Sequence, residues 1–268
     1  ENTEHLQLDV SPDNAAFLSV VPESMAKNRS INANLVVGER LPYPSSLGNY
    51  STTYFTVNGH VAYCLESAKS SPPSSDYVAN IFESNLALQK VLYYGYGGPG
   101  DITDSYMPGF DWKLKYIFTH IAASYAYCGT DGFYGCTFEN IQSSGLWDYI
   151  QYLNGLEAPP KAAIDLSPTS AAAYESNGEQ RTKEFHLKGD HRNYITLNLP
   201  ENVTYHSGDA TKTGSVKISG GTKFYFSAPM TVTGTWNSGS LAGQMGTQWK
   251  TLVVSTGGTT QDIGYGTF

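Results

Sequence analysis

Segments with alternating apolar and polar residues occupy both ends of this chain, and a longer hydrophobic period occupies its middle. Apolar residues recur every three or four positions over 76–94, 111–127 and 140–154, which predicts three helices, the first capped by Asp76. A β-rich region begins at 35–37 and runs to residue 64. Beyond residue 181, short alternating runs between Gly, Pro and Asn turns predict strands at 185–187, 194–199, 215–218, 223–226 and 251–254.

This order of periods predicts an α+β protein. Strands precede and follow the helices, so we expect one β domain, a sandwich or a barrel, with an inserted helical subdomain. Residues 1–75 would form the first part of the β domain, 76–160 the helical insertion and 161–268 the second part. The 268 residues are enough to bury a sizeable core as one domain overall.

Charge and hydropathy exclude two classes of partner. The formal net charge is −8 and no basic stripe is present, which argues against nucleic acid. No apolar run approaches the roughly 18 to 20 residues that cross a bilayer, so no membrane insertion is expected within this segment. Charged residues make up only 15%, and Tyr, Ser and Gly are abundant, as is common in extracellular proteins. We expect a soluble monomer.

The three cysteines divide into a pair and a single residue. Cys128 and Cys136 flank a glycine-rich loop, which predicts a disulfide between them, whereas a metal site would need two more soft ligands nearby. Cys64 is then the odd cysteine, at the end of an apolar strand and before a Ser- and Pro-rich loop. It is either a small buried hydrophobe or a reactive centre.

His120 lies in the middle of the second predicted helix and also has two interpretations. It is either a hydrogen-bonded histidine in or near the core, or a polar partner that faces Cys64. The glycine-rich stretch 94–101 is a structured turn, because no strand precedes it and no Lys-Ser/Thr pair follows.

Short blocks of the chain resemble the thioester domains of Gram-positive surface adhesins and pilus tips. They occur in the order that this family uses and span most of the chain. The middle block has histidine where the family has glutamine in Thr-Gln-x-Ala. The blocks are Tyr63-Cys64-Leu65-Glu66, Thr119-His120-Ile121-Ala122 and Thr260-Gln261-Asp262-Ile263, together with the stretch 90–96.

The resemblance implies an internal thioester between Cys64 and Gln261, with Gln244 and Gln248 as alternative partners for the cysteine. It also implies that the domain covalently captures a lysine amine on a host surface or matrix protein, without turnover and without a cofactor. His120 would either manage protons at this site or orient the helix beneath it. Such a domain is extracellular and is anchored to the cell wall through regions outside this segment.

Two other function classes compete with this one. Cys64 and His120 could be the nucleophile and base of an acyltransferase or peptidase, with Asp104, Asp111 or Glu66 orienting the histidine. Alternatively, the chain could be a non-covalent β-sandwich binding module with an inert cysteine.

Overall fold

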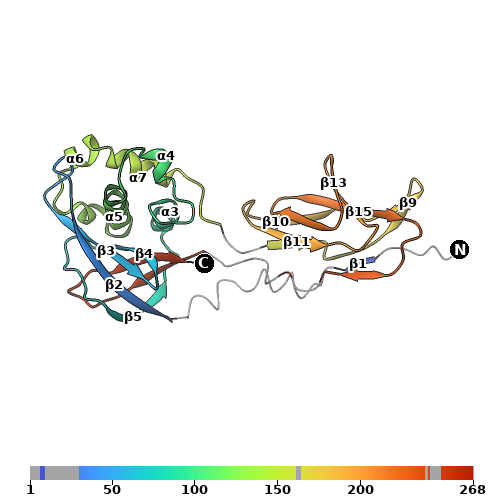
Figure 1. The fold of residues 1–268 in the computed structure, drawn as a ribbon, viewed down its shortest axis with the longest axis horizontal. Coiled ribbons are helices and arrows are strands. Elements are labelled where there is room, and N and C mark those ends of the chain that lie inside the picture. The colour runs from blue at the N-terminus through green and yellow to red at the C-terminus, as the bar shows by residue number, and fades with distance from the viewer. Residues whose placement is uncertain (1–6, 10–29, 161–163, 239–240, 242–248, 268) are drawn as a thin grey trace. The chain divides into compact units, whose positions relative to one another are not determined.

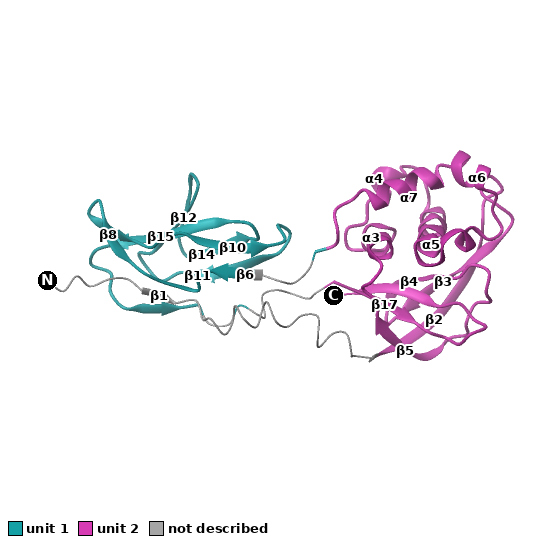
Figure 2. Cartoon of the chain, turned by 180° about the vertical axis from the view of Figure 1, so that it is seen from behind, with its two compact units in different colours: residues 1–26, 160–248 teal, residues 27–159, 249–268 magenta. Residues whose placement is uncertain are grey.

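The computed structural model describes residues 7–9, 30–160, 164–238, 241 and 249–267. The chain divides into two compact units, shown in different colours in Figure 2: unit 1 comprises 1–26 and 160–248, and unit 2 comprises 27–159 and 249–268. This division differs from the expected one, which placed all of 161–268 in the same β domain as 1–75. Only the last strands, after residue 248, return to the unit that contains Cys64.

Unit 2 contains a closed antiparallel barrel with the strand order β17-β18-β4-β3-β2-β5. Strand β18, near the C-terminus, pairs with β4, so strands that are distant in sequence lie side by side in the barrel (Figure 1). Closure leaves the barrel without an unpaired edge. The strands are β2 (Ser30–Pro42), β3 (Ser51–Val57), β4 (His60–Cys64), β5 (Ser75–Ile81), β17 (Lys250–Val254) and β18 (Ile263–Thr267).

The described helices all lie between residues 86 and 154, as expected, but the first begins later than predicted. Residues 75–81 form strand β5, which pairs with β2 and β17. The helix begins after Asn85, whose side chain caps it by accepting a hydrogen bond from Leu88 N. A short apolar run does not distinguish strand from helix, and the barrel neighbours decide it here. The helices are α3 (Leu86–Tyr94), α4 (Thr103–Tyr106), α5 (Trp112–Cys128), the 3₁₀ helix η1 (Gly129–Phe133), α6 (Phe138–Ser143) and α7 (Leu146–Asn154).

Asp111 caps α5 by accepting from Leu114 N. Gly145 adopts a φ of 87° between α6 and α7, which breaks the single helix expected over 140–154. None of the helices in the described residues is long and apolar enough to cross a membrane.

Strand β4 separates two hydrophobic cores. Ala62 and Cys64 pack inside the barrel, whereas Tyr63 and the following Leu65 pack with the helices. This alternation follows from the two-residue period of a strand. The buried Tyr116 of α5 joins the layers, since its hydroxyl donates to Ala62 O at 2.6 Å. Figure 1 shows α3 and α5 lying against the barrel, which fixes the helices above the end of β4.

The described part of unit 1 consists of strands packed around buried aromatic residues, among them Phe185, Phe224 and Phe226. Together the two units give the α+β class that the sequence predicts. The strands of unit 1 are β1 (Gln7–Asp9), β6 (Ile164–Ser167), β7 (Ser170–Ala172), β8 (Tyr174–Ser176), β9 (Glu179–Arg181), β10 (Phe185–Gly189), β11 (Tyr194–Asn198), β12 (Thr204–Ser207), β13 (Ala210–Lys212), β14 (Ser215–Ser219), β15 (Lys223–Pro229) and β16 (Thr235–Asn237).

Candidate functional site

The pairing of β4 with β18 brings Cys64 to the segment that contains Gln261. Cys64 is the register partner of Ile263, and Leu65 N donates to Asp262 O at 2.9 Å, which extends the pairing by one residue. Gln261 precedes Ile263 by two positions and lies just before β18 begins. The pairing therefore brings the segment with Gln261 to the end of β4.

The side chain of Gln261 is buried and held by the loop that follows Cys64. Its Nε2 donates to Lys69 O at 2.5 Å, and its backbone N donates to Ser70 O at 3.0 Å. Its Oε1 is buried without a hydrogen-bond partner among the described residues. A buried amide oxygen without a donor is unfavourable, so this carboxamide is poorly satisfied as it stands.

The Cys64 thiol is enclosed in apolar surroundings. The residue is 1% exposed and packs with the barrel core, beside Ala62 and Ile263. Burial raises the pKa of the Cys64 thiol well above its usual range. The sulfur is therefore protonated at neutral pH, unlike the thiolates that act as nucleophiles in cysteine enzymes.

His120 contacts the backbone of Cys64, and both of its ring nitrogens have partners. Nδ1 donates to Cys64 O at 3.1 Å, since a carbonyl oxygen only accepts, so Nε2 accepts, at 3.0 Å, from the Tyr43 hydroxyl. The Ser67 hydroxyl also lies 3.4 Å from Nε2 and 3.0 Å from Ser124 Oγ. Burial lowers the pKa of His120 to about 4, so the ring is neutral at pH 7.

This geometry differs from a cysteine–histidine catalytic pair, in which a ring nitrogen faces the sulfur. The three carboxylates that could orient such a histidine are engaged elsewhere. Asp111 caps α5, Asp104 pairs with Lys115, and Glu66 pairs with Lys69.

The predicted disulfide is wrong. Both Cys128 and Cys136 are free cysteines. Cys128 ends α5, and its thiol donates to Leu65 O and Ser124 O, toward the Cys64 strand, while Cys136 lies beside Gly48. The loop between them folds as η1 and directs the two side chains to different neighbours. Burial raises the pKa of each thiol to about 11, which keeps both protonated at neutral pH.

Other residues of this network carry no signal in the sequence. Tyr43 precedes His120 by 77 residues, and Ser67 lies in the loop that composition alone describes as Ser- and Pro-rich. Only the packing of α5 onto the barrel brings them together. The alternative partners Gln244 and Gln248 lie outside the described residues.

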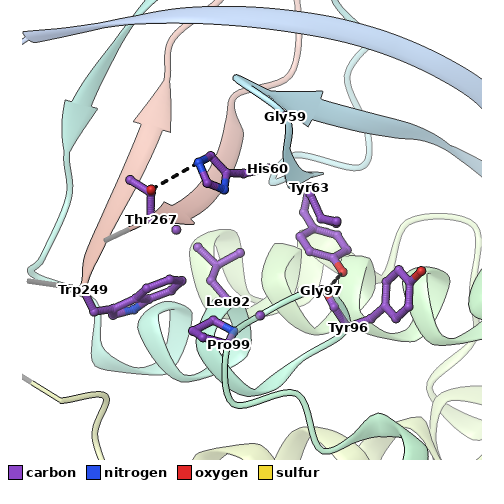
Figure 3. A pocket seen from close by; sticks show the side chains of 12 residues that line it. Gly59, His60, Tyr63, Leu92, Tyr96, Gly97, Pro99, Trp249 and Thr267 are labelled. Atoms are coloured by element: carbon purple, nitrogen blue, oxygen red, sulfur yellow. Dashed lines mark hydrogen bonds between the residues drawn. The ribbon is translucent and has the colours of Figure 1, made fainter. Parts of the chain in front are cut away.

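A separate pocket of about 510 Å³ lies at the opposite end of the same two strands. Gly59 and His60 line it from the start of β4, and Gly266 and Thr267 line it from the end of β18. Figure 3 shows Trp249 on its wall and a hydrogen bond between Thr267 and His60. Tyr63 of β4 also lines it, but Cys64, His120 and Gln261 do not, so this pocket is distinct from the candidate site.

The chain belongs to the thioester-domain family. The family model "Thioester domain" matches residues 32–160, and the model "TED associated beta sandwich domain" matches residues 165–245. The boundary between the two matches falls close to the boundary between unit 2 and unit 1. The first match includes Cys64 and His120 and ends before Gln261.

One solved structure with low sequence identity shares the fold. The structure described as the Bacillus anthracis TIE protein has a TM-score of 0.57 at 15% identity, over 88% of this chain and 46% of that chain. This chain therefore spans less than half of that relative. The thioester domain of the Enterococcus faecium TIE86 protein has a TM-score of 0.45 at 11% identity, over 89% of this chain and 93% of that chain. No curated protein matches the chain.

Proposed function

We propose that this chain forms an internal thioester between Cys64 and Gln261 and uses it to capture an amine covalently. The observation that carries the proposal is the register of β4 and β18, in which Cys64 pairs with Ile263, two residues after Gln261. The buried, unpartnered Oε1 of Gln261 supports it, since the carboxamide is held but incompletely hydrogen-bonded.

Thioester formation requires attack of the Cys64 sulfur on the carboxamide carbon of Gln261. A C–S bond forms, the C–N bond breaks, and the thiol proton leaves with the nitrogen as ammonia. Holding both groups in contact supplies most of the rate enhancement, because it makes the reaction intramolecular. Exclusion of water from this buried strand end protects the product from hydrolysis.

We assign His120 a positioning role in this reaction. It holds the carbonyl of Cys64 through Nδ1 and thereby fixes the end of β4. Its lowered pKa and its hydrogen bond to Tyr43 make it a poor proton donor at neutral pH, which favours the orienting role over proton transfer.

The thioester is a single-use electrophile. A lysine amine of a host surface or matrix protein attacks the carbonyl of Gln261, an amide forms, and Cys64 is released as a thiol. Membership of the thioester-domain family supports this use, as well as an extracellular adhesin attached to the cell wall through other regions. The bond also closes a loop of about 200 residues, which in a chain-entropy estimate stabilises the fold by about 5 kcal/mol.

Intact mass measurement tests the proposal. The wild-type protein should be one ammonia lighter than its sequence requires, and methylamine should add to it and expose one thiol. Gln261→Ala and Cys64→Ser should each have the full sequence mass and should not take up methylamine.

Gln244→Ala and Gln248→Ala are the matched controls for the choice of glutamine. Both should keep the mass deficit of the wild type. If Gln261→Ala still loses ammonia and one of these variants does not, the cysteine has another partner. A wild-type protein of full mass that turns over an amide substrate would favour the enzyme class instead.

A further inference from the structure

The pocket between the start of β4 and the end of β18 has the dimensions of a small-ligand site. Its volume is about 510 Å³, within the range of about 300–1,000 Å³ that such sites occupy. All the residues that line it belong to unit 2. They come from the two strand ends, from the end of α3 with the glycine-rich turn that follows it, and from Trp249, just before β17.

Aromatic rings form two sides of this pocket. Figure 3 shows Trp249 on one side and Tyr63 and Tyr96 on the other. Trp249 packs edge-on against Tyr93, with ring centroids 5.3 Å apart, and the Tyr63 hydroxyl donates to Tyr96 O at 2.5 Å. These contacts hold the rings in place within the protein itself, so binding of a ligand would order few side chains.

The glycine-rich turn over 94–101 supplies a wall made of backbone. Gly97 has a φ of 83°, and a Cβ at this position would lie 2.7 Å from the side chain of Val61. Only glycine therefore lets the turn approach β4 so closely. The Asp101 carboxylate accepts from Gly97 N at 3.1 Å and fixes the turn from behind.

The chemistry of the lining favours a neutral ligand that carries hydroxyl groups. Among the lining residues that the structure describes, none is an Asp, Glu, Lys or Arg. At the strand ends the polar side chains are the Thr267 hydroxyl and the His60 imidazole, whose Oγ1 and Nε2 atoms lie 3.3 Å apart. A hydroxyl both donates and accepts hydrogen bonds, and so does an imidazole in its neutral form. Sugar hydroxyls require partners of this kind.

We propose that this pocket binds a neutral mono- or disaccharide, with the apolar face of a sugar ring against the aromatic walls and its hydroxyls on Thr267 and His60. Flat, rigid aromatic rings provide apolar area for stacking, and the strand-end groups provide the polar contacts. The site shares no lining residue with Cys64, His120 or Gln261. It adds a reversible, non-covalent binding activity that does not depend on the thioester.

A proline-rich peptide is the other ligand that aromatic walls commonly bind. Such a peptide has no internal hydrogen bonds, so its carbonyl oxygens need donors from the protein. The Tyr63 hydroxyl on this wall already donates to Tyr96 O. The pair of Thr267 and His60, which can both donate and accept, suits a saccharide better.

Saturation-transfer NMR with the intact chain tests the site, using glucose, galactose, mannose, N-acetylglucosamine, lactose and cellobiose as probes. The wild-type protein should transfer saturation to a neutral sugar of this set, most strongly to the protons of one ring face. Titration then gives the dissociation constant. The matching uronic acid should bind no more tightly, because the described lining holds no cation.

Two variants locate the binding. Tyr96→Ala removes part of one wall but keeps the backbone carbonyl that accepts from Tyr63, and Thr267→Val removes a hydroxyl while keeping the side-chain shape. Each should weaken binding of the sugar about tenfold. Tyr152→Ala and Thr211→Val are the matched controls, an exposed tyrosine of α7 and an exposed strand threonine of unit 1, and both should bind as the wild type does.

Thermal unfolding confirms that each variant is folded before its affinity is compared. The inference is overturned if the folded wild type transfers saturation to none of the six sugars, or if Tyr96→Ala and Thr267→Val both keep the wild-type affinity. Binding of decaproline at this pocket in place of the sugars would also overturn it, and would favour the peptide. None of these measurements involves the thioester, whose absence would appear separately as a wild-type protein without the ammonia deficit.

Discussion

His120 donates a hydrogen bond from Nδ1 to the backbone carbonyl of Cys64 at 3.1 Å. This contact is with the backbone of Cys64 and not with its sulfur. The bond joins the middle of α5 to the end of β4, the point at which the barrel meets the helices. It also fixes the tautomer of the ring, because Nε2 must then accept from Tyr43.

The buried neutral His120 should make stability depend on pH. Its pKa falls from 6.5 in the unfolded chain to about 4 in the folded protein, so the unfolded chain binds more protons between these values. The contribution of neutral His120 to the free energy of unfolding is complete above pH 6.5. It is lost as pH falls toward 4, by about 3 kcal/mol in total. Denaturant unfolding at pH 7.5 and 4.5 measures it.

His120→Gln should lose this part of the pH dependence, because glutamine does not titrate. His60→Gln is the control, since His60 is exposed at the other end of β4 and should leave the dependence unchanged. Equal pH dependence in wild type and His120→Gln would show that the histidine does not titrate as stated.

The hydroxyl of Tyr116 should contribute to stability out of proportion to its size. It accepts from Phe55 N at 3.1 Å and donates to Ala62 O at 2.6 Å, in a fully buried position between α5 and the barrel. Tyr116→Phe leaves both backbone groups without this partner and should cost about 1–3 kcal/mol. Urea unfolding measures the loss. Tyr134→Phe, which removes the hydroxyl of a side chain that is half exposed, should change stability little.

Gly266 should tolerate no larger side chain. A Cβ at this position would lie 2.0 Å from the ring of Trp249, on the wall of the pocket in Figure 3. Gly266→Ala therefore forces β18 or the indole to move and should destabilise the protein by about 1–3 kcal/mol. Gly258→Ala is the control, because nothing lies within 4 Å of a Cβ there. Thermal unfolding that ranks the two variants equally would contradict the packing.

Thiol counting should distinguish the three cysteines. In unfolded, unreduced protein, Cys128 and Cys136 should both be labelled, because neither forms a disulfide. Cys64 should be labelled only after methylamine has opened the proposed thioester. Labelling of no thiol before methylamine would mean that the two are bonded to each other, and labelling of all three would mean that no thioester is present.

The sequence by itself determined the class of fold and placed Cys64 at the end of a strand. The helical periods over 111–127 and 140–154 and the alternation in the strands are local properties that a chain displays without its tertiary neighbours. The strand-end position of Cys64 and the short blocks around it, His120 and Gln261 were likewise readable from residue order.

Only the tertiary structure decided which β segments share a barrel and what surrounds Cys64, His120 and Gln261. Residues 75–81 are a strand because they pair with β2 and β17. The strands after residue 160 divide between two units, because strand pairing joins segments that are distant in sequence. The disulfide prediction failed for the same reason: loop length allows two cysteines to meet, but η1 turns their side chains toward other neighbours. Hydrogen bonds such as Tyr43 to His120 depend on packing between elements, which no local pattern encodes.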